Sequence, residues 1–259
     1  TQGQFPMPFG RNIYLYLDLY LQNDESVRKA IDEAKYLNQK LKNNLLIVRI
    51  TRPTTVQIMN FIKEELKHFP SIILLIDYAN KGFNKIIKED FRKNNIGMIM
   101  LTAEMFSNKE NIQNVLDLKI PIFKFGKENL KAVKRTAIIL NDTNSYEQIS
   151  PIVFDISSQL KIRTKIFDLD PIGEKDGKST LLDHFENLAK IFNEKIEVVT
   201  SSQNPIRELK KEKDMLQLLP LKESMFKKKF LFKFLYTNSD FIAFNSNKYN
   251  QLLIPIVEE

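Results

Sequence analysis

The sequence predicts an α/β protein of two similar halves, each a five-stranded, mostly parallel sheet flanked by helices. Two observations lead to this fold class. Short apolar runs alternate with longer amphipathic stretches, which is typical of parallel β-α-β units. The order of these elements then starts again near the middle of the chain, and the last strand expected in each half contains the same Ile-Pro-Ile triplet, at residues 120–122 and 254–256.

The first half begins with a segment rich in Ile, Leu and Tyr, Asn12–Leu21, which predicts a strand followed by a turn at Asn23 and Asp24. Apolar residues at helical spacing then predict a helix over Glu25–Leu41. Its apolar face is expected to consist of Val27, Ile31, Ala34, Leu37 and Leu41.

The remaining elements of the first half follow the same alternation. Leu45–Thr51 predicts a strand that ends before Pro53, and Thr54–Phe69 predicts a helix with Thr54 or Thr55 as its N-cap. The continuous apolar run Ser71–Asp77 is typical of strands in parallel sheets. The last expected elements are helix 84–93, strand 96–102, helix 108–118 and strand 120–125.

The charged stretch Lys127–Arg135 is the expected boundary between the halves. The expected organisation is therefore a tag or linker over 1–10, a first domain over 11–130 and a second over 131–259. In the second, Thr180 and Asp183 form a capping box that begins one helix. The expected elements are strand 136–140, helix 145–160, strand 161–169, helix 180–192, strand 196–200, helix 204–219, an apolar aromatic segment 230–235, and strands 240–245 and 252–257.

Composition excludes several classes of protein. The 259 residues are 43% hydrophobic and 27% charged, which is ordinary for globular domains. There is no cysteine, so disulfides and thiolate metal sites are excluded, and the two histidines, His68 and His184, lie on different expected helices, so no metal site is expected. The net charge of +7 is spread evenly over both halves, whereas nucleic-acid binders concentrate it, so no nucleic-acid partner is expected. Apolar runs such as Ile72–Ile76 are too short to span a membrane.

Two stretches of the second half resemble the opening of a universal stress protein domain. They are the strand Thr136–Leu140 with Asn141 and Asp142 after it, and the strand-like segment Lys161–Pro171 with its Asp-Leu-Asp-Pro ending. Asn12–Thr51 resembles the same opening more loosely, and no residue there clearly matches the family's aspartate. The resemblance covers nearly the whole chain as two copies, and it implies tandem domains that form a pseudo-dimer.

The resemblance implies a ligand site with a marked departure from the family pattern. Asp142 matches the family's aspartate near the nucleotide pocket, with Asn141 beside it, although a plain turn residue explains it equally well. Nucleotide-binding members carry a glycine-rich loop after the fourth strand, whose amide groups hold phosphates. Neither expected loop, Thr102–Asn108 or Asn245–Gln251, contains a glycine, so the usual phosphate site is not expected.

The segment Gly173–Thr180 resembles a P-loop but has three residues between its glycines where the motif has four. A flexible loop before the Thr180 cap explains it more simply. Lys178 and Ser179 nevertheless remain candidates for weak binding of an anion or nucleotide at the helix start. No other cofactor is expected.

The leading hypothesis is a non-catalytic regulatory or ligand-sensing module, since no acid–base cluster accompanies the missing glycine loop. Tandem domains of this kind occur as cytoplasmic tails of bacterial sodium or potassium/proton antiporters, so a cytoplasmic region tethered to its own membrane domain is expected. The alternative is a stand-alone tandem stress protein that binds a nucleotide or small anion through a non-standard loop. An enzyme of the nucleotide-binding α-hydrolase type is a third hypothesis.

The final strands of the two halves also predict how the halves pair with each other. An apolar edge strand invites aggregation unless it is paired. Residues 120–125 are therefore expected to pair with residues 252–257, with a homodimer as the alternative.

Overall fold

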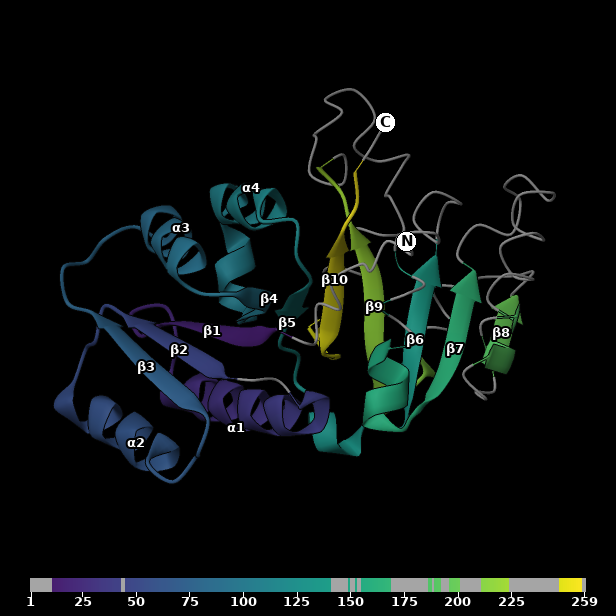
Figure 1. Ribbon diagram of the computed structural model, residues 1–259, viewed down its shortest axis with the longest axis horizontal. Helices are drawn as coiled ribbons and strands as arrows, with labels where there is room; N and C mark the ends of the chain where they lie inside the picture. The colour runs from purple at the N-terminus through teal and green to yellow at the C-terminus, as the bar shows by residue number, and fades with distance from the viewer. Residues whose placement is uncertain are drawn as a thin grey trace. The chain divides into compact units, whose positions relative to one another are not determined.

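The computed structural model describes residues 11–42, 45–140, 149, 152, 155–168, 186–187, 189–191, 196–200, 211–223 and 247–257. The chain divides into two compact units, residues 1–125 and 126–259. Each unit contains its own run of parallel strands (Figure 1).

Unit 1 alternates strands and helices along its whole length. Its strands are β1 (Asn12–Asp18), β2 (Leu46–Thr51), β3 (Ile72–Asp77), β4 (Ile96–Leu101) and β5 (Ile122–Lys124). Its helices are α1 (Asp24–Leu41), α2 (Val56–Leu66), α3 (Phe83–Lys93) and α4 (Lys109–Asp117), with the short 3₁₀ helix η2 (Ala103–Ser107) after β4. These nine strands and α-helices match the predicted elements of the first half in type and order.

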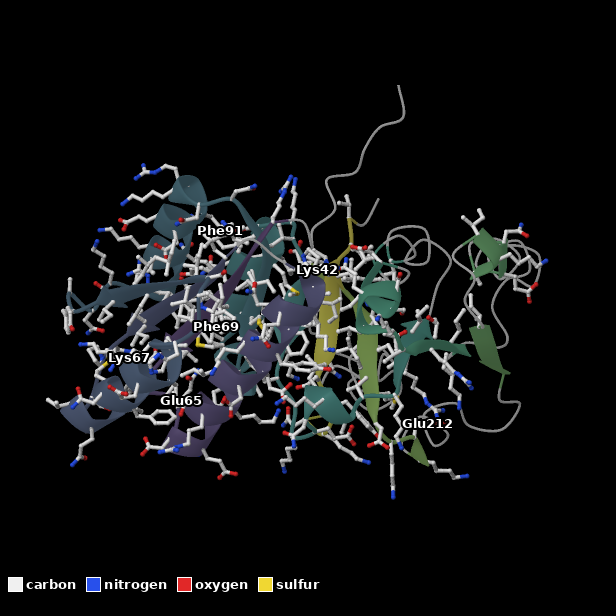
Figure 2. The ribbon with its side chains drawn as sticks, turned by 60° about the horizontal axis from the view of Figure 1, so that its bottom comes forward. Lys42, Glu65, Lys67, Phe69, Phe91 and Glu212 are labelled. Atoms are coloured by element: carbon white, nitrogen blue, oxygen red, sulfur yellow. The ribbon has the colours of Figure 1, made fainter. Side chains whose placement is uncertain are left out.

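The strand order in unit 1 is β3-β2-β1-β4-β5, and each neighbouring pair is parallel. Helices α1 and α2 cover one face of these strands, and α3 and α4 cover the other (Figure 1). The aromatic rings of α3 face the sheet. Phe83 packs edge-on against Tyr16 at 4.8 Å between ring centroids. Phe91, labelled in Figure 2, packs likewise against Tyr14 at 5.8 Å.

Helix α1 shows why the sequence pattern predicts this unit well. Asn23 caps its first turn by accepting a hydrogen bond from the Ser26 amide, and Lys42 ends it in the left-handed conformation. All five residues of the predicted apolar face are buried. Because the helix packs on the sheet through a single face, its burial follows the spacing of apolar residues.

Unit 2 repeats the strand order of unit 1. Its strands are β6 (Arg135–Leu140), β7 (Arg163–Asp168), β8 (Ile196–Thr200), β9 (Met215–Leu221) and β10 (Gln251–Pro255). They are ordered β10-β9-β6-β7-β8, again with every neighbouring pair parallel. When the strands of each unit are counted from its first, both orders are 3-2-1-4-5, which confirms the predicted fold of two similar parallel α/β domains.

A trio of buried hydroxyl groups holds one helical segment of unit 2 on its sheet. Ser157, in the helical residues 155–160, lies 2.7 Å from the Thr136 hydroxyl of β6 and accepts a hydrogen bond of 3.1 Å from Thr164 of β7. Because side chains alternate along a strand, Arg135, Arg163 and Lys165 belong to the opposite face of these strands.

The fourth strand of unit 2 is a correction to the sequence analysis. A helix over 204–219 was predicted, but Met215–Leu221 forms β9, between β6 and β10. Every residue of β9 is buried, so both faces of this strand are covered. Its sequence therefore shows neither the spacing of an amphipathic helix nor the alternation of a half-buried strand. The apolar aromatic segment 230–235 and the predicted strand 240–245 lie outside the described residues.

Within the described part of the chain, no helix combines the length and the apolar character that crossing a membrane requires.

Candidate functional site

The carboxyl ends of the unit 1 strands form the first candidate site. In open parallel α/β sheets, ligands bind outside these ends, where the strand order changes direction. In unit 1 that point lies between β1 and β4, which are neighbours in the sheet although β2 and β3 separate them along the chain. The loops that follow β1, β2, β3 and β4 lie at this end of the sheet, and we call them the unit 1 carboxyl edge.

Asp18, the last residue of β1, is the central carboxylate of this edge. It is buried, and its Oδ1 accepts a hydrogen bond of 3.0 Å from the Tyr20 amide. The Arg52 guanidinium donates to both carboxylate oxygens, with its Nε 3.0 Å from each. Asp18 is thus saturated by a backbone amide and a forked ion pair, which leaves it poorly suited to act as a general base.

Arg52 occupies an unusual backbone conformation directly after β2. Its φ of 49° lies in the left-handed region, which is costly for a residue with a side chain. Its guanidinium carbon lies 4.9 Å from the ring centroid of Tyr20, and the hydrogen bonds that it donates to Asp18 raise the Arg52 pKa above its ordinary value. The strained turn thereby fixes a cation and an aromatic ring together at the carboxyl edge.

Gln22 and Thr102 bridge the point where the strand order changes. Gln22, in the loop after β1, donates from Nε2 to the Thr102 hydroxyl at 2.7 Å, and Thr102 directly follows β4. Both residues are buried, with exposed fractions of 6% and 3%. The other amide atom, Gln22 Oε1, is buried and accepts no hydrogen bond from the described residues. A buried acceptor without a partner costs free energy, which a ligand that carries an N–H or O–H group would recover.

Large apolar side chains are exposed around the same edge. Among the described residues of unit 1, the exposed large apolar side chains are Tyr20 and Leu21 after β1, Val56 at the start of α2, and Tyr78 after β3. Asp77 shapes the last of these loops by accepting hydrogen bonds from the amides of Ala79 and Lys81, at 3.1 and 3.0 Å. Exposed aromatic side chains at the ligand-binding end of a sheet of this kind are available for contact with a ligand.

The loop after β4 lacks the features that would hold a phosphate. It forms the 3₁₀ helix η2, whose Glu104 carboxylate accepts a 3.4 Å hydrogen bond from the Ser26 hydroxyl in the first turn of α1. The same turn carries Asp24 and Glu25, and its Ser26 amide is already capped by Asn23. Three carboxylates at a helix N-terminus repel an anion, although the dipole alone would attract it.

The four site residues predicted from the sequence, Asn141, Asp142, Lys178 and Ser179, lie outside the described residues. The correction to β9 also moves the fourth-strand loop of unit 2 from residues 245–251 to the residues after Leu221. That stretch, 222–250, contains no glycine either.

The sequence analysis missed Asp18, Gln22 and Arg52. It extended the first strand to Leu21, so Asp18 was placed inside a strand instead of at its end. The signal was present, because aspartate is depleted inside strands and its occurrence within an apolar run favours a strand end there.

Comparison with known proteins supports the fold alone. No family model and no curated protein matches the sequence. Among solved structures, the chain is similar to a universal stress protein candidate of Pseudomonas aeruginosa UCBPP-PA14, with a TM-score of 0.64 and 11% identity over 96% of this chain and 94% of that one. The fold is that of the universal stress proteins.

Two further structures agree with this universal stress protein fold. A protein of unknown function from Pseudomonas aeruginosa PAO1 aligns with a TM-score of 0.63 and 11% identity, over 96% of this chain and 93% of that one. A universal stress protein of Archaeoglobus fulgidus DSM 4304 aligns with a TM-score of 0.56 and 12% identity, over 95% of this chain and 97% of that one. Sequence identities of 11–12% show a shared architecture only, and the chemistry of the site depends on this chain's own residues.

Proposed function

We propose that the chain is a non-catalytic, ligand-sensing module of the universal stress protein fold, with a ligand site at the unit 1 carboxyl edge. The observation that carries this proposal is the buried Oε1 of Gln22, an acceptor without a partner among the described residues, at the point where ligands bind to sheets of this kind. The absence of catalysis is proposed because Asp18 and Asp77, the buried carboxylates of this edge, are both occupied by hydrogen bonds.

The side chains of the edge favour an uncharged ligand with an aromatic ring. Tyr20, whose ring carries the Arg52 guanidinium on one face, and Tyr78 are exposed, and Gln22 Oε1 offers an acceptor for an amino or hydroxyl group. The carboxylates of Asp24, Glu25 and Glu104 oppose a phosphate. A nucleoside combines an aromatic ring with amino and hydroxyl groups and carries no charge. Its phosphorylated forms add a negative charge, which these carboxylates disfavour.

Isothermal titration with adenosine and with AMP tests this proposal. We expect adenosine to bind more tightly than AMP, and the variant Gln22→Met, which removes the acceptor at similar volume, to weaken adenosine binding about three- to tenfold. Gln39→Met is the matched control, because Gln39 is an exposed glutamine at the opposite end of α1. Tighter binding of AMP, or equal affinities for wild type and Gln22→Met, would contradict the proposed site.

We further propose that the module belongs to a bacterial sodium or potassium/proton antiporter and reports a ligand to that protein's membrane domain. The support is the resemblance of the two halves to tandem stress-protein tails. The uninterrupted reading frame around this sequence tests the placement, since the proposal requires several apolar segments of about 20 residues within it. A frame without them would favour the alternative, a stand-alone tandem stress protein.

A further inference from the structure

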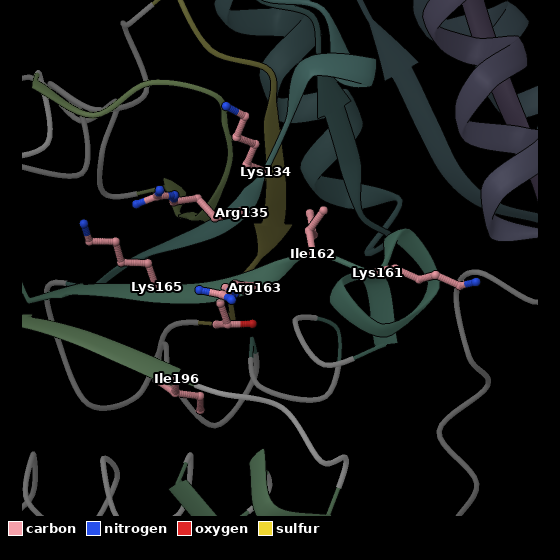
Figure 3. Close-up of a pocket in the computed structure, with 8 residues that line it drawn as sticks. Lys134, Arg135, Lys161, Ile162, Arg163, Lys165 and Ile196 are labelled. Atoms are coloured by element: carbon pink, nitrogen blue, oxygen red, sulfur yellow. The ribbon is translucent and has the colours of Figure 1, made fainter.

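A basic cavity lies in unit 2, at the amino-terminal ends of β6, β7 and β8 (Figure 3). Its volume of about 580 Å³ is within the range of sites for small ligands. Five of its eight lining residues carry a positive charge: Lys134, Arg135, Lys161, Arg163 and Lys165. Parallel α/β sheets bind their ligands at the carboxyl ends of the strands, and this cavity lies at the opposite, amino-terminal ends. Neither the proposed function nor the fold therefore accounts for the cavity.

The topology gathers three of these cations on one face of adjacent strands. Arg135 and Arg163 are partners in the register of β6 and β7, and Lys165 lies two residues further along β7. Figure 3 shows these three side chains on one side of the strands, with Lys161 extending away from them. Neighbouring strands are about 4.8 Å apart, so the two guanidinium groups start from closely spaced backbone positions.

The acidic groups around the cavity do not balance its charge among the described residues. Glu212 is shared by two cations: its Oε2 lies 3.3 Å from Arg135 Nη1, and its Oε1 forms an ion pair with Lys165. Asp214 lies 3.7 Å from the Lys134 ammonium. Glu197 is the register partner of Lys165 on β8. Arg163 is exposed and forms no ion pair within the described part of the chain.

One of the five cations, Lys165, is buried. The exposed fraction of Lys165 is 7%, so its ammonium cannot move freely into water. Glu212 forms ion pairs with both Lys165 and Arg135, which holds these two cations in place. Several cations around a concave site attract anions, and the planar guanidinium group matches the geometry of phosphate oxygens.

We propose that this cavity is a binding site for a small anion with two linked phosphate groups, held by Arg135 and Arg163 and attracted by Lys165. Inorganic pyrophosphate and the diphosphate end of a nucleotide share this chemistry. The inference is independent of the ligand proposed for unit 1, because the two sites have no residue in common and favour opposite ligand charges.

Titration of the whole chain with sodium pyrophosphate and with ADP, at 20 and 200 mM salt, tests the proposal. We expect saturable binding that weakens at the higher salt concentration. Arg163→Gln should weaken it about tenfold or more, because one charge-assisted contact is lost. Arg92→Gln is the matched control, since Arg92 is an exposed arginine of unit 1, and it should leave binding unchanged. Similar affinities for pyrophosphate and ADP would identify the phosphates as the recognised group, and tighter binding of ADP would add a contact to the nucleoside.

A second variant changes the affinity in the opposite direction. Glu212→Gln removes the shared acid at constant shape, so pyrophosphate should bind at least threefold more tightly. Absence of binding to wild type at millimolar pyrophosphate, equal affinity in Arg163→Gln, or weaker binding in a folded Glu212→Gln would each overturn the proposal. Far-UV circular dichroism and thermal unfolding establish that each variant is folded.

Discussion

Asp90 is the buried carboxylate through which α3 is held on the unit 1 sheet. It accepts hydrogen bonds from Arg49 Nε at 2.7 Å, from Arg49 Nη2 at 2.5 Å and from the Tyr14 hydroxyl at 2.5 Å. Burial raises the Tyr14 pKa well above its ordinary value, and the neighbouring Asp90 charge raises it further. The hydroxyl therefore stays protonated and remains a donor throughout the physiological pH range.

We expect Asp90→Ala to lower the free energy of unfolding by about 3–5 kcal/mol, because it leaves the Arg49 charge and the Tyr14 hydroxyl without their shared partner. Tyr14→Phe should cost only about 1 kcal/mol, since the bidentate pair survives it. Urea unfolding measures both values. The exposed Asp117→Ala on α4 serves as the control, and a loss no larger at Asp90 than at Asp117 would show that the network is not stabilising.

Lys124 of β5 is a second buried ionisable group, and it contributes unfavourably at neutral pH. Its exposed fraction is 3%, and burial lowers its pKa from 10.5 to about 8. Because the folded protein binds this proton more weakly than the unfolded chain does, this group makes stability rise as the pH increases from about 8 to about 10.5. Below pH 8 its destabilising contribution is complete, at about 3 kcal/mol.

Lys124→Met should therefore stabilise the protein at pH 7 and abolish this contribution to the pH dependence. The difference in free energy of unfolding between the variant and wild type should shrink as the pH rises towards 10.5. Urea unfolding at pH 7, 8, 9 and 10 gives this difference directly. A constant difference would mean that the ammonium is not desolvated in the folded state.

At the scale of secondary structure elements, predictability from sequence depends on how clearly the type and spacing of the apolar residues separate a helix from a strand. Helix α1 buries one face, so the spacing of its apolar residues predicted the helix almost to the residue. Strand β9 buries both, and Met215–Leu221 has no period that separates a strand from a buried helix. The candidate site was less predictable still, because Gln22 and Thr102 are 80 residues apart and meet only through the β1–β4 pairing.

Strand β9 should tolerate a polar side chain without a hydrogen-bond partner on neither face. Its own buried Gln217 accepts a hydrogen bond of 2.8 Å from Gln251. Leu218 and Leu219 are both fully buried and lie on opposite faces of the strand. We expect Leu218→Asn and Leu219→Asn each to cost about 3–5 kcal/mol, through lost apolar burial and an unsatisfied amide. The midpoint of urea denaturation reports both, and little change at either position would imply that one face of this strand meets water.

At the scale of the whole molecule, one strand order is used twice with different chemistry. The carboxyl edge of unit 1 surrounds its helix start with carboxylates, whereas the amino edge of unit 2 gathers cations around a cavity. The two sites proposed above would thus favour ligands of different charge on one repeated fold, in agreement with the rule that function depends on the site and not on the fold. Pairing of residues 120–125 with residues 252–257 stays a prediction from the sequence.

Mg-ATP should bind the whole chain more weakly than about 100 μM, which corresponds to roughly 5–6 kcal/mol of binding free energy. The residues after β4 form η2 and contain no glycine, and residues 222–250 of unit 2 contain no glycine either. Without glycine the backbone cannot easily approach a phosphate, and Glu104 adds repulsion in unit 1. Isothermal titration at 150 mM salt measures the affinity, and low-micromolar binding would contradict the prediction. Titration of Lys178→Met and Arg163→Gln would then locate the phosphates, at the segment Gly173–Thr180 if the first variant weakens binding and in the basic cavity if the second does.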